Sequence, residues 1–343
     1  MNEELLRRVS NAFGISGFED DIQAVVNAEL GASCDETRRD RMGNVIGLKR
    51  AASIPAGAER ALRVVVAAHA DEIGMMVKYI DPQGFIFFQA VGGLQPLAIT
   101  SQQVTIHGIE PVRGVICPAD ETVQRALELD DLVIDVGLSR EEVVTRVEVG
   151  DPISFSQELV QLNAGVYLGR NFDDRIGTYC LLEAMRRVGP TRVDVYAVST
   201  VQEEIGVRGA WPAAYAIEPD IGIALDGSLC RGGGVWSDPK VRTCELGLGT
   251  GIYVYDKLTM PDRRLVRFLA SLGEEHGIPF QRNVGGGTDA SALQRTGVGA
   301  LATTIGAPVR YMHSTVQLCH AEDIEATVRL LTVFLEHAHE LEL

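Results

Sequence analysis

A long stretch of short, turn-punctuated segments separates two regions of longer segments in this sequence, and this division limits the possible folds. Between about Lys78 and Ser156, short runs alternate with turn signals such as DPQG, VGG and EVGD, which predicts a small barrel or sandwich. On both sides, apolar strand-like runs alternate with helix-like segments, which indicates an α/β domain. We therefore expect an α/β domain interrupted by a β-rich insertion, which a length of 343 residues allows.

The bulk composition restricts the partners and the location of the protein. A formal net charge of -16 argues against nucleic acid and anionic membranes as partners. No apolar run approaches the ~20 residues that span a bilayer, and the amphipathic start, MNEELLRRVSNAFG, lacks the apolar core of a signal peptide. None of the six cysteines forms a CxxC pair, which speaks against a zinc ribbon. We expect a soluble, cytoplasmic protein that binds neither nucleic acid nor membranes.

Ionisable side chains gather where the strand-like runs of the α/β part end. Such residues follow the apolar runs in VVVAAHADE, VYAVSTVQEE and IGIALDG, begin the helix-like segment FDDR, and recur in RYMHS. Ligands of open α/β sheets bind beyond the carboxyl ends of the strands, so chain direction predicts that these groups share one edge. The candidate residues are His69, Asp71, Asp173, Asp174, Glu203, Glu204, Asp226 and His313.

His69 and Asp71, taken separately, admit two interpretations. Two residues apart on a strand, they would face the same side. Asp71 could then accept the second ring N–H of His69, as carboxylates do beside metal-bound imidazole. The alternative is a polar pair exposed to solvent at the end of the strand.

The two acidic pairs are also ambiguous when taken one at a time. Glu203 and Glu204 cannot point the same way from an extended backbone, which suits two tasks, metal binding and proton transfer. They could also lie in the first turn of a helix, where the helix dipole favours acidic residues. Asp173 and Asp174 could be the N-cap and first turn of the following helix.

The last two candidates, Asp226 and His313, indicate a metal site only when they are taken together with the other candidates. A lone carboxylate after a buried run needs a partner, whereas a lone histidine is more often structural than a ligand. Together, two histidines, several carboxylates and no cysteine describe a nitrogen and oxygen site for Zn²⁺, Co²⁺ or Mn²⁺. The ligands suffice for two metal ions with one shared carboxylate; such ions lie ~3.5–4 Å apart and activate a bridging water for hydrolysis.

The segment NVGGGTDASALQRTG contains a glycine loop, residues 285–289, before a helix-like stretch. A loop of this kind can bind an anion, but the Lys-Ser/Thr ending of a phosphate loop is absent. The loop could line a substrate pocket, with Thr288 or Asp289 capping the next helix, or it could have a structural role alone.

The order and spacing of six motifs resemble those of a known enzyme family: HADEIG, FDDRIG, VQEEIGVRGA, LDGS, GGGTDASA and RYMHS. The family comprises the dinuclear metallo-aminopeptidases known as glutamyl or tetrahedral aminopeptidases, some of which carry the labels endoglucanase, cellulase M or FrvX. The resemblance implies a zinc-peptidase-like α/β fold, a mixed sheet sandwiched by helices, formed by residues 1–75 and 159–343. Residues 76–158 would form an inserted small β-barrel that mediates dimerisation. Relatives often assemble further into hollow tetrahedral dodecamers.

The resemblance also implies which residues bind the metal ions. His69 and Asp226 would bind one ion, and Glu204 and His313 would bind the second. Asp173 would bridge the two ions, because the second position of the aspartate pair varies to Asn in relatives. The ions would be Zn²⁺ or Co²⁺.

Other roles follow from the same resemblance. Glu203 would be the general base, Asp71 would orient the first histidine, and Asp174 would be a supporting residue. Two positions depart from many relatives: Asn171 stands where a small residue is common, and Thr315 replaces a proline. Neither is a proposed ligand, although both lie near the site.

The implied reaction is removal of the N-terminal residue of short peptides, with a metal-bridged water activated by Glu203. An acidic cleft would suit the protonated amine of the substrate. One alternative is a metal-dependent deacylase or deacetylase. A second is a glycosidase, which can work with two carboxylates and no metal, but it needs neither histidine, and aromatic residues make up just 6% of the chain. A non-catalytic scaffold on the same fold would have lost Glu203 or a ligand.

Overall fold

The computed structural model describes residues 1–343 except 55–56, 121–124, 164 and 232–242. The helices are α1 (Glu3–Asn11), α2 (Asp20–Ser33), α3 (Pro96–Ile99), α4 (Arg140–Val143), α5 (Phe172–Arg187), α6 (Ala210–Ile217), α7 (Arg263–Glu275), α8 (Ala290–Arg295) and α9 (Ala321–His337), with the short 3-10 helices η1 (Leu129–Asp131) and η2 (Ala338–Glu340). The strands are β1 (Glu36–Arg39), β2 (Val45–Lys49), β3 (Arg63–His69), β4 (Gly74–Ile80), β5 (Ile86–Val91), β6 (Gln103–His107), β7 (Pro111–Pro118), β8 (Leu132–Asp135), β9 (Pro152–Phe155), β10 (Val160–Asn163), β11 (Val166–Gly169), β12 (Asp194–Thr200), β13 (Ile221–Leu225), β14 (Ser228–Leu229), β15 (Thr250–Asp256), β16 (Phe280–Gly285), β17 (Leu301–Gly306), β18 (Pro308–Arg310) and β19 (Gln317–His320). Within the described part of the chain, no helix has the length and apolar character that a membrane span requires.

The central sheet is mixed, and its described strands lie in the order β1-β2-β12-β3-β13-β17-β15-β16. The four strands β12, β3, β13 and β17 run parallel, and β2 pairs with β12 in the antiparallel direction. In this register Thr200 of β12 pairs with His69 of β3, and Leu225 of β13 pairs with Ala68 of β3. The carboxyl ends of three neighbouring strands therefore lie side by side.

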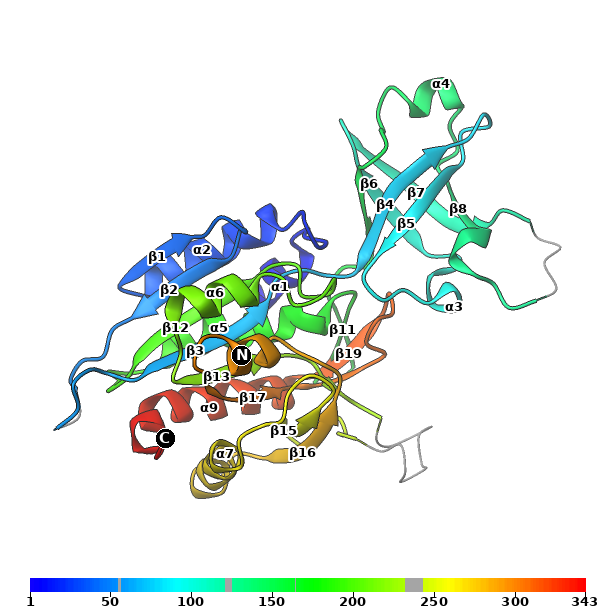
Figure 1. Cartoon of the computed structure of the whole chain (residues 1–343). Helices are drawn as coiled ribbons and strands as arrows, with labels where there is room; N and C mark the ends of the chain where they lie inside the picture. The colour runs from blue at the N-terminus through cyan, green and yellow to red at the C-terminus, as the bar shows by residue number, and fades with distance from the viewer. Residues whose placement is uncertain (55–56, 121–124, 164, 232–242) are drawn as a thin grey trace.

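Helices cover both faces of this sheet (Figure 1). The central strand β3 is apolar and buried almost throughout, as is usual for a parallel strand covered on both sides. Its side chains alternate between the faces: Val64, Val66 and Ala68 belong to the core beneath α5 and α9, and Val65 and Ala67 to the smaller core beneath α6 and α8. The expected mixed sheet sandwiched by helices is confirmed.

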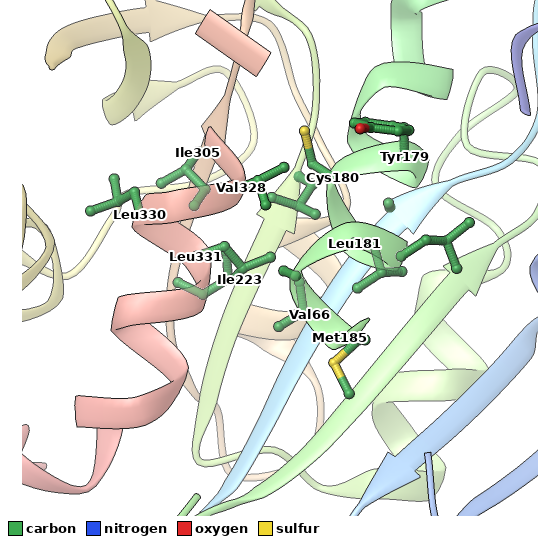
Figure 2. Packing of buried hydrophobic residues seen from close by; sticks show 14 of the residues in the cluster. Val66, Tyr179, Cys180, Leu181, Met185, Ile223, Ile305, Val328, Leu330 and Leu331 are labelled. Carbon is green, nitrogen blue, oxygen red and sulfur yellow. The ribbon is translucent and has the colours of Figure 1, made fainter. Parts of the chain in front are cut away.

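The larger core lies between the sheet and the helices α5 and α9. Figure 2 shows Leu181 and Met185 of α5 and Leu331 of α9 gathered with Val66 and Ile223 of the sheet. Each fully buried side chain of this size contributes roughly 1.5–3 kcal/mol. This packing fixes α5 on β3, and with it the first turn of α5, at the edge where the candidate residues lie.

The β-rich stretch forms a closed barrel of the strands β4-β5-β8-β7-β6-β9, which stands to one side of the α/β domain (Figure 1). It has a core of its own, to which Met75, Ile106 and Ile153 belong. The expected inserted β-barrel is thus confirmed, and the same stretch contains the short helices α3 and α4. The barrel strands begin at Gly74 and end at Phe155; the limits 76–158 of the inserted domain stay a prediction.

The run LRVVVAAHADEIGMMV contains two strands in different sheets. It is divided between β3, which ends at His69 in the central sheet, and β4, which begins at Gly74 in the barrel. The link contains Asp71 and Glu72, which are buried and hydrogen-bonded to distant parts of the chain. Buried carboxylates need such partners. The break therefore depends on tertiary contacts, which local periodicity does not reveal.

Candidate active site

The candidate residues lie at one edge of the central sheet, as chain direction predicts. The strands β3, β12 and β13 are adjacent and parallel, and their carboxyl ends lead to His69, Glu203 and Asp226. Asp173 comes from the first turn of α5, which packs on β3. His313 comes from the turn between β18 and β19, in a separate five-stranded sheet. Segments that are far apart in the sequence therefore meet at this edge.

Asp173 lies between the two histidines. Its Oδ1 is 3.3 Å from Nε2 of His69, and its Oδ2 is 3.2 Å from Nε2 of His313. The same nitrogen of His313 is 3.6 Å from Oε2 of Glu204. One ligand atom each of His69, Asp173 and Glu204 lies within 4.8 Å of the others. A carboxylate that reaches a different histidine with each oxygen has the arrangement expected of a ligand shared by two metal ions.

The helix-terminal interpretation holds for one of the four paired acidic residues. Glu203 and Glu204 are not in the first turn of α6, which begins well after them. The backbone of Asp173 and Asp174 is not helical, although both belong to the start of α5. Oδ1 of Asp174 accepts the N–H of Gly177 at 3.0 Å, which is the bond of an N-cap residue, while the carboxylate of Asp173 contacts the histidines.

The histidines and Asp173 stabilise one another's charged forms. Burial by itself would lower the pKa of His69, but hydrogen bonds with Asp173 and Asp71 outweigh burial and raise this pKa well above its ordinary value. The hydrogen bond with Asp173 raises the pKa of His313 to about 9. Burial would raise the pKa of Asp173, but the hydrogen bonds from His313 and His69 outweigh it and lower this pKa.

The other carboxyl groups of the site show the opposite shift. Burial, followed by the charge of Asp173, raises the pKa of Glu204 to about 8. Burial also raises the pKa of Glu203 and that of Asp226 well above the ordinary range. Among the described residues, the buried Oε1 of Glu204 has no hydrogen-bond partner. A divalent cation would offset the crowded negative charge and give this oxygen a partner, so the donor set fits such an ion.

The carboxylate of Asp71 binds the backbone of the two glutamates more closely than it binds the ring of His69. Nδ1 of His69 is 3.0 Å from the carbonyl oxygen of Asp71 and 3.5 Å from its Oδ1. Oδ1 of Asp71 accepts the N–H of Glu203 at 2.9 Å, and Oδ2 accepts the N–H of Glu204 at 3.1 Å. Asp71 therefore orients the segment that carries the glutamates as well as contacting the histidine.

Asp226 leaves β13 at a point where β17 passes very close. Its N–H donates to the carbonyl oxygen of Ile305 at 3.3 Å, and a Cβ on Gly306 would lie 1.6 Å from the carbonyl oxygen of Asp226. Only glycine permits this approach of the two backbones. The side chain of Asp226 is buried and borders the same cavity as the other candidates.

A cavity of about 470 Å³ opens on the candidate residues. The candidates that line it are Asp173, Glu203, Glu204, Asp226 and His313. Its wall also includes apolar side chains, among them Leu229, Tyr253, Leu258 and Met312. The mixture of carboxylates, imidazole and apolar surface is typical of a small-molecule or peptide site.

The glycine loop borders this cavity, in agreement with the pocket interpretation. Gly286, Gly287 and Thr288 are lining residues. Oγ1 of Thr288 accepts the N–H of Ala290 at 3.2 Å, whereas the side chain of Asp289 makes no cap bond to α8. Asp289 instead accepts the hydroxyl of Thr200, at the end of β12.

A loop of the barrel also reaches the site, and no local pattern in the sequence indicates this contact. Gln95 lines the cavity, and a Cβ on Gly93 would lie 2.7 Å from Nδ1 of His313. In the sequence, VGG indicated a turn and nothing more. The requirement for glycine next to His313 arises only when the barrel packs against the α/β domain.

Comparisons with known proteins find relatives over nearly the whole length. Residues 43–330 match the family described as M42 glutamyl aminopeptidase. A lysyl aminopeptidase of Pyrococcus furiosus is 31% identical, over 97% of this chain and 96% of its own. The solved structure of an aminopeptidase from Desulfurococcus kamchatkensis has a TM-score of 0.92 and 32% sequence identity to this chain. The match covers 97% of this chain and 94% of the other. The Pyrococcus horikoshii TET1 peptidase is 30% identical with a TM-score of 0.84, covering 97% of this chain and 98% of its own.

Proposed function

Since the chain belongs to the M42 glutamyl aminopeptidase family and is a peptide hydrolase, we propose that it removes the N-terminal residue of short peptides with two divalent metal ions. The observation that carries the proposal is the position of Asp173 between His69 and His313. Glu203 and Glu204 border the same cavity. Nitrogen and oxygen donors of this kind suit Zn²⁺ or Co²⁺.

The proposed ligands are those that the family resemblance implies. His69 and Asp226 would hold one ion, Glu204 and His313 would hold the other, and Asp173 would be shared. The contact of each Asp173 oxygen with a different histidine supports the shared role. When bound, the ions would supply Lewis acidity toward the scissile carbonyl and the attacking water.

Glu203 is the proposed general base and acid. Its carboxylate does not belong to the compact ligand group of His69, Asp173 and Glu204 that the described residues form, yet Glu203 lines the cavity. It would take a proton from the attacking water and deliver it to the leaving amine. The backbone N–H of Glu203 donates a hydrogen bond to Asp71, which fixes the backbone position of Glu203.

The charge of the cavity supports an aminopeptidase rather than a carboxypeptidase. Four carboxylates line it, Asp173, Glu203, Glu204 and Asp226. A protonated N-terminal amine is attracted to such a lining, whereas a C-terminal carboxylate is repelled.

A deacylase is the second candidate function, because the same metal ligands could serve the cleavage of an amide that has no free amine. The contacts of both histidines with Asp173 argue against a metal-free glycosidase.

We also propose that copies of the chain assemble into homo-oligomers. The Pyrococcus horikoshii TET1 peptidase can assemble into a tetrahedron or a large octahedral shell. Dimers, a tetrahedral dodecamer and the cytoplasmic location stay predictions.

Metal removal is expected to abolish hydrolysis of free-amine substrates. The measurement is release of the leaving group from a panel of aminoacyl-anilides, before and after chelation and after addition of Zn²⁺ or Co²⁺. Activity should disappear with the chelator and return with the metal, because ions held by the proposed ligands would supply the Lewis acidity that the hydrolysis needs. N-acetylated versions of the same substrates are the control and should not be cleaved. Absence of release from every free-amine substrate under every metal condition would contradict the aminopeptidase and favour the deacylase.

The side-chain preference is expected to be acidic. Arg231 is the sole lysine or arginine among the described residues that line the cavity, and hydrogen bonds to charged groups are worth ~1.5–3 kcal/mol. The wild type should therefore prefer glutamyl over lysyl substrates. Arg231→Ala should lower kcat/KM for a glutamyl anilide roughly tenfold or more while changing the value for a leucyl anilide by less than about twofold. Arg267→Ala, an exposed arginine on α7, is the matched control. An unchanged ratio of glutamyl to leucyl activity would show that Arg231 does not meet the substrate.

A further inference from the structure

The backbone that carries the two glutamates leaves the sheet before it reaches them. The strand β12 ends at Thr200, so the N–H groups of residues 201–204 lie beyond the strand ladder. Gln202 also has a positive φ of 57°, which is uncommon for a residue other than glycine. Backbone N–H groups that are removed from water need acceptors. For this run the acceptors are side chains.

Three side chains from distant segments accept these four N–H groups in turn. Oδ1 of Asn44 accepts the first at 3.0 Å, and Oε1 of Glu19 accepts the second at 3.1 Å. The carboxylate of Asp71 accepts the third and the fourth, at 2.9 Å and 3.1 Å. The conformation of residues 201–204 is therefore set by contacts outside the sheet.

The segment between α1 and α2, residues 12–19, supplies one of these acceptors, Glu19, and binds a second, Asp71. Oγ of Ser16 donates to Oδ2 of Asp71 at 2.6 Å. The N–H of Gly17 donates at 2.8 Å to the same Oε1 of Glu19 that binds the backbone beyond β12. Ser16 and Glu19 are 4% and 6% exposed, so water does not compete with these bonds. The segment thus binds the backbone just before the glutamates directly, through Glu19 at Gln202. It supports the backbone of the glutamates themselves indirectly, because Ser16 binds Asp71.

We propose that Ser16 and Glu19 are positioning residues for the reaction of Glu203, although Glu19 and Gln202 are 183 positions apart in the sequence. The inference rests on the proposed function, because it concerns the placement of the proposed general base. Neither residue is among the described residues that line the cavity, so both act through other groups and not on the substrate. A reacting group must be held within ~0.5 Å of its productive position, and a 1 Å displacement can cost ~10²-fold in rate.

The experiment compares two substitutions of Glu19 with the wild type. Glu19→Ala removes the acceptor of the Gln202 N–H, whereas Glu19→Gln keeps a carbonyl oxygen of the same reach. At saturating Zn²⁺ or Co²⁺, Glu19→Ala should lower kcat by about 10–100-fold and change KM by less than about threefold. Glu19→Gln should keep most of kcat. Bound metal per subunit, measured by atomic emission, should stay near the wild-type value in both variants.

Two further variants keep the test decisive. Asp20→Ala removes the neighbouring carboxylate, which is exposed, and should behave as the wild type. Ser16→Ala should also lower kcat. If Glu19→Ala does not fold, the kcat of Ser16→Ala tests the positioning role. Wild-type kcat in Glu19→Ala or in Ser16→Ala would overturn the positioning role, as would equal losses in Glu19→Ala and Glu19→Gln. Inactivity of the wild type itself toward every free-amine substrate would instead overturn the proposed function.

Discussion

Glu203→Gln is expected to remove most of the turnover while leaving the metal content near the wild-type value. Glutamine cannot take the proton of the attacking water, and a general base of this kind typically contributes roughly 10²–10⁴-fold. The metal content should hold because the compact ligand group in the described residues consists of His69, Asp173 and Glu204. The measurement pairs kcat on a free-amine aminoacyl-anilide with atomic emission of the purified protein.

Glu204→Gln is the matched control, because the two side chains are neighbours with different proposed roles. Glu204 lies 3.6 Å from His313 and belongs to the ligand group, so its substitution should lower metal content and activity together. Both variants keep the size of the side chain, which limits effects on packing. High residual activity in Glu203→Gln would mean that another group moves the proton. Parallel loss of metal in both variants would mean that Glu203 is itself a ligand.

Glu72→Gln is expected to lower the free energy of unfolding by about 3–5 kcal/mol, the usual effect of removing one partner from a buried ion pair. Glu72 is 2% exposed. Its carboxylate accepts Nε and Nη2 of Arg170 at 2.8 and 3.0 Å, and Nη2 of Arg175 at 3.3 Å. It also accepts Nδ2 of Asn171 at 3.0 Å. The substitution leaves two buried guanidinium groups without this negative charge. Urea unfolding at fixed metal concentration measures the loss.

Glu36→Gln provides the comparison on the surface. Glu36 also pairs with an arginine, Arg50, but the two side chains are 60% and 59% exposed. A pair in this setting typically contributes less than about 1 kcal/mol. Equal midpoints for Glu72→Gln and Glu36→Gln would show that the buried cluster adds no more stability than an exposed pair.

The fold and the position of the site followed from local patterns. Apolar runs such as Val64–Ala68 predicted buried strands, and the direction of the chain placed His69, Glu203 and Asp226 at one edge. Both inferences depend on short-range periodicity and on the parallel order of the strands. The short runs and frequent turn signals between about 78 and 156 predicted the barrel, because these are also local features of the sequence.

The bonds that hold the site were not accessible to this reasoning. The sequence placed Asp71 on a strand beside His69, whereas its carboxylate accepts the backbone N–H groups of Glu203 and Glu204. Asn171 had no predicted partner, yet its Nδ2 donates a hydrogen bond to Oε2 of Glu72. A side chain that binds a distant backbone group leaves no periodic signal.

The sequence by itself determined the α/β class, the β-rich insertion, the edge of the sheet at which the chemistry gathers, and the donor types present there. These properties depend on residue type and on spacings of a few residues. The tertiary structure alone decided that Asp173 lies between the two histidines, that Gly93 of the barrel lies against His313, and that Glu19 holds the backbone before Glu203. Such contacts join residues about 100 or more positions apart, so they exist only once the packed core fixes their separation.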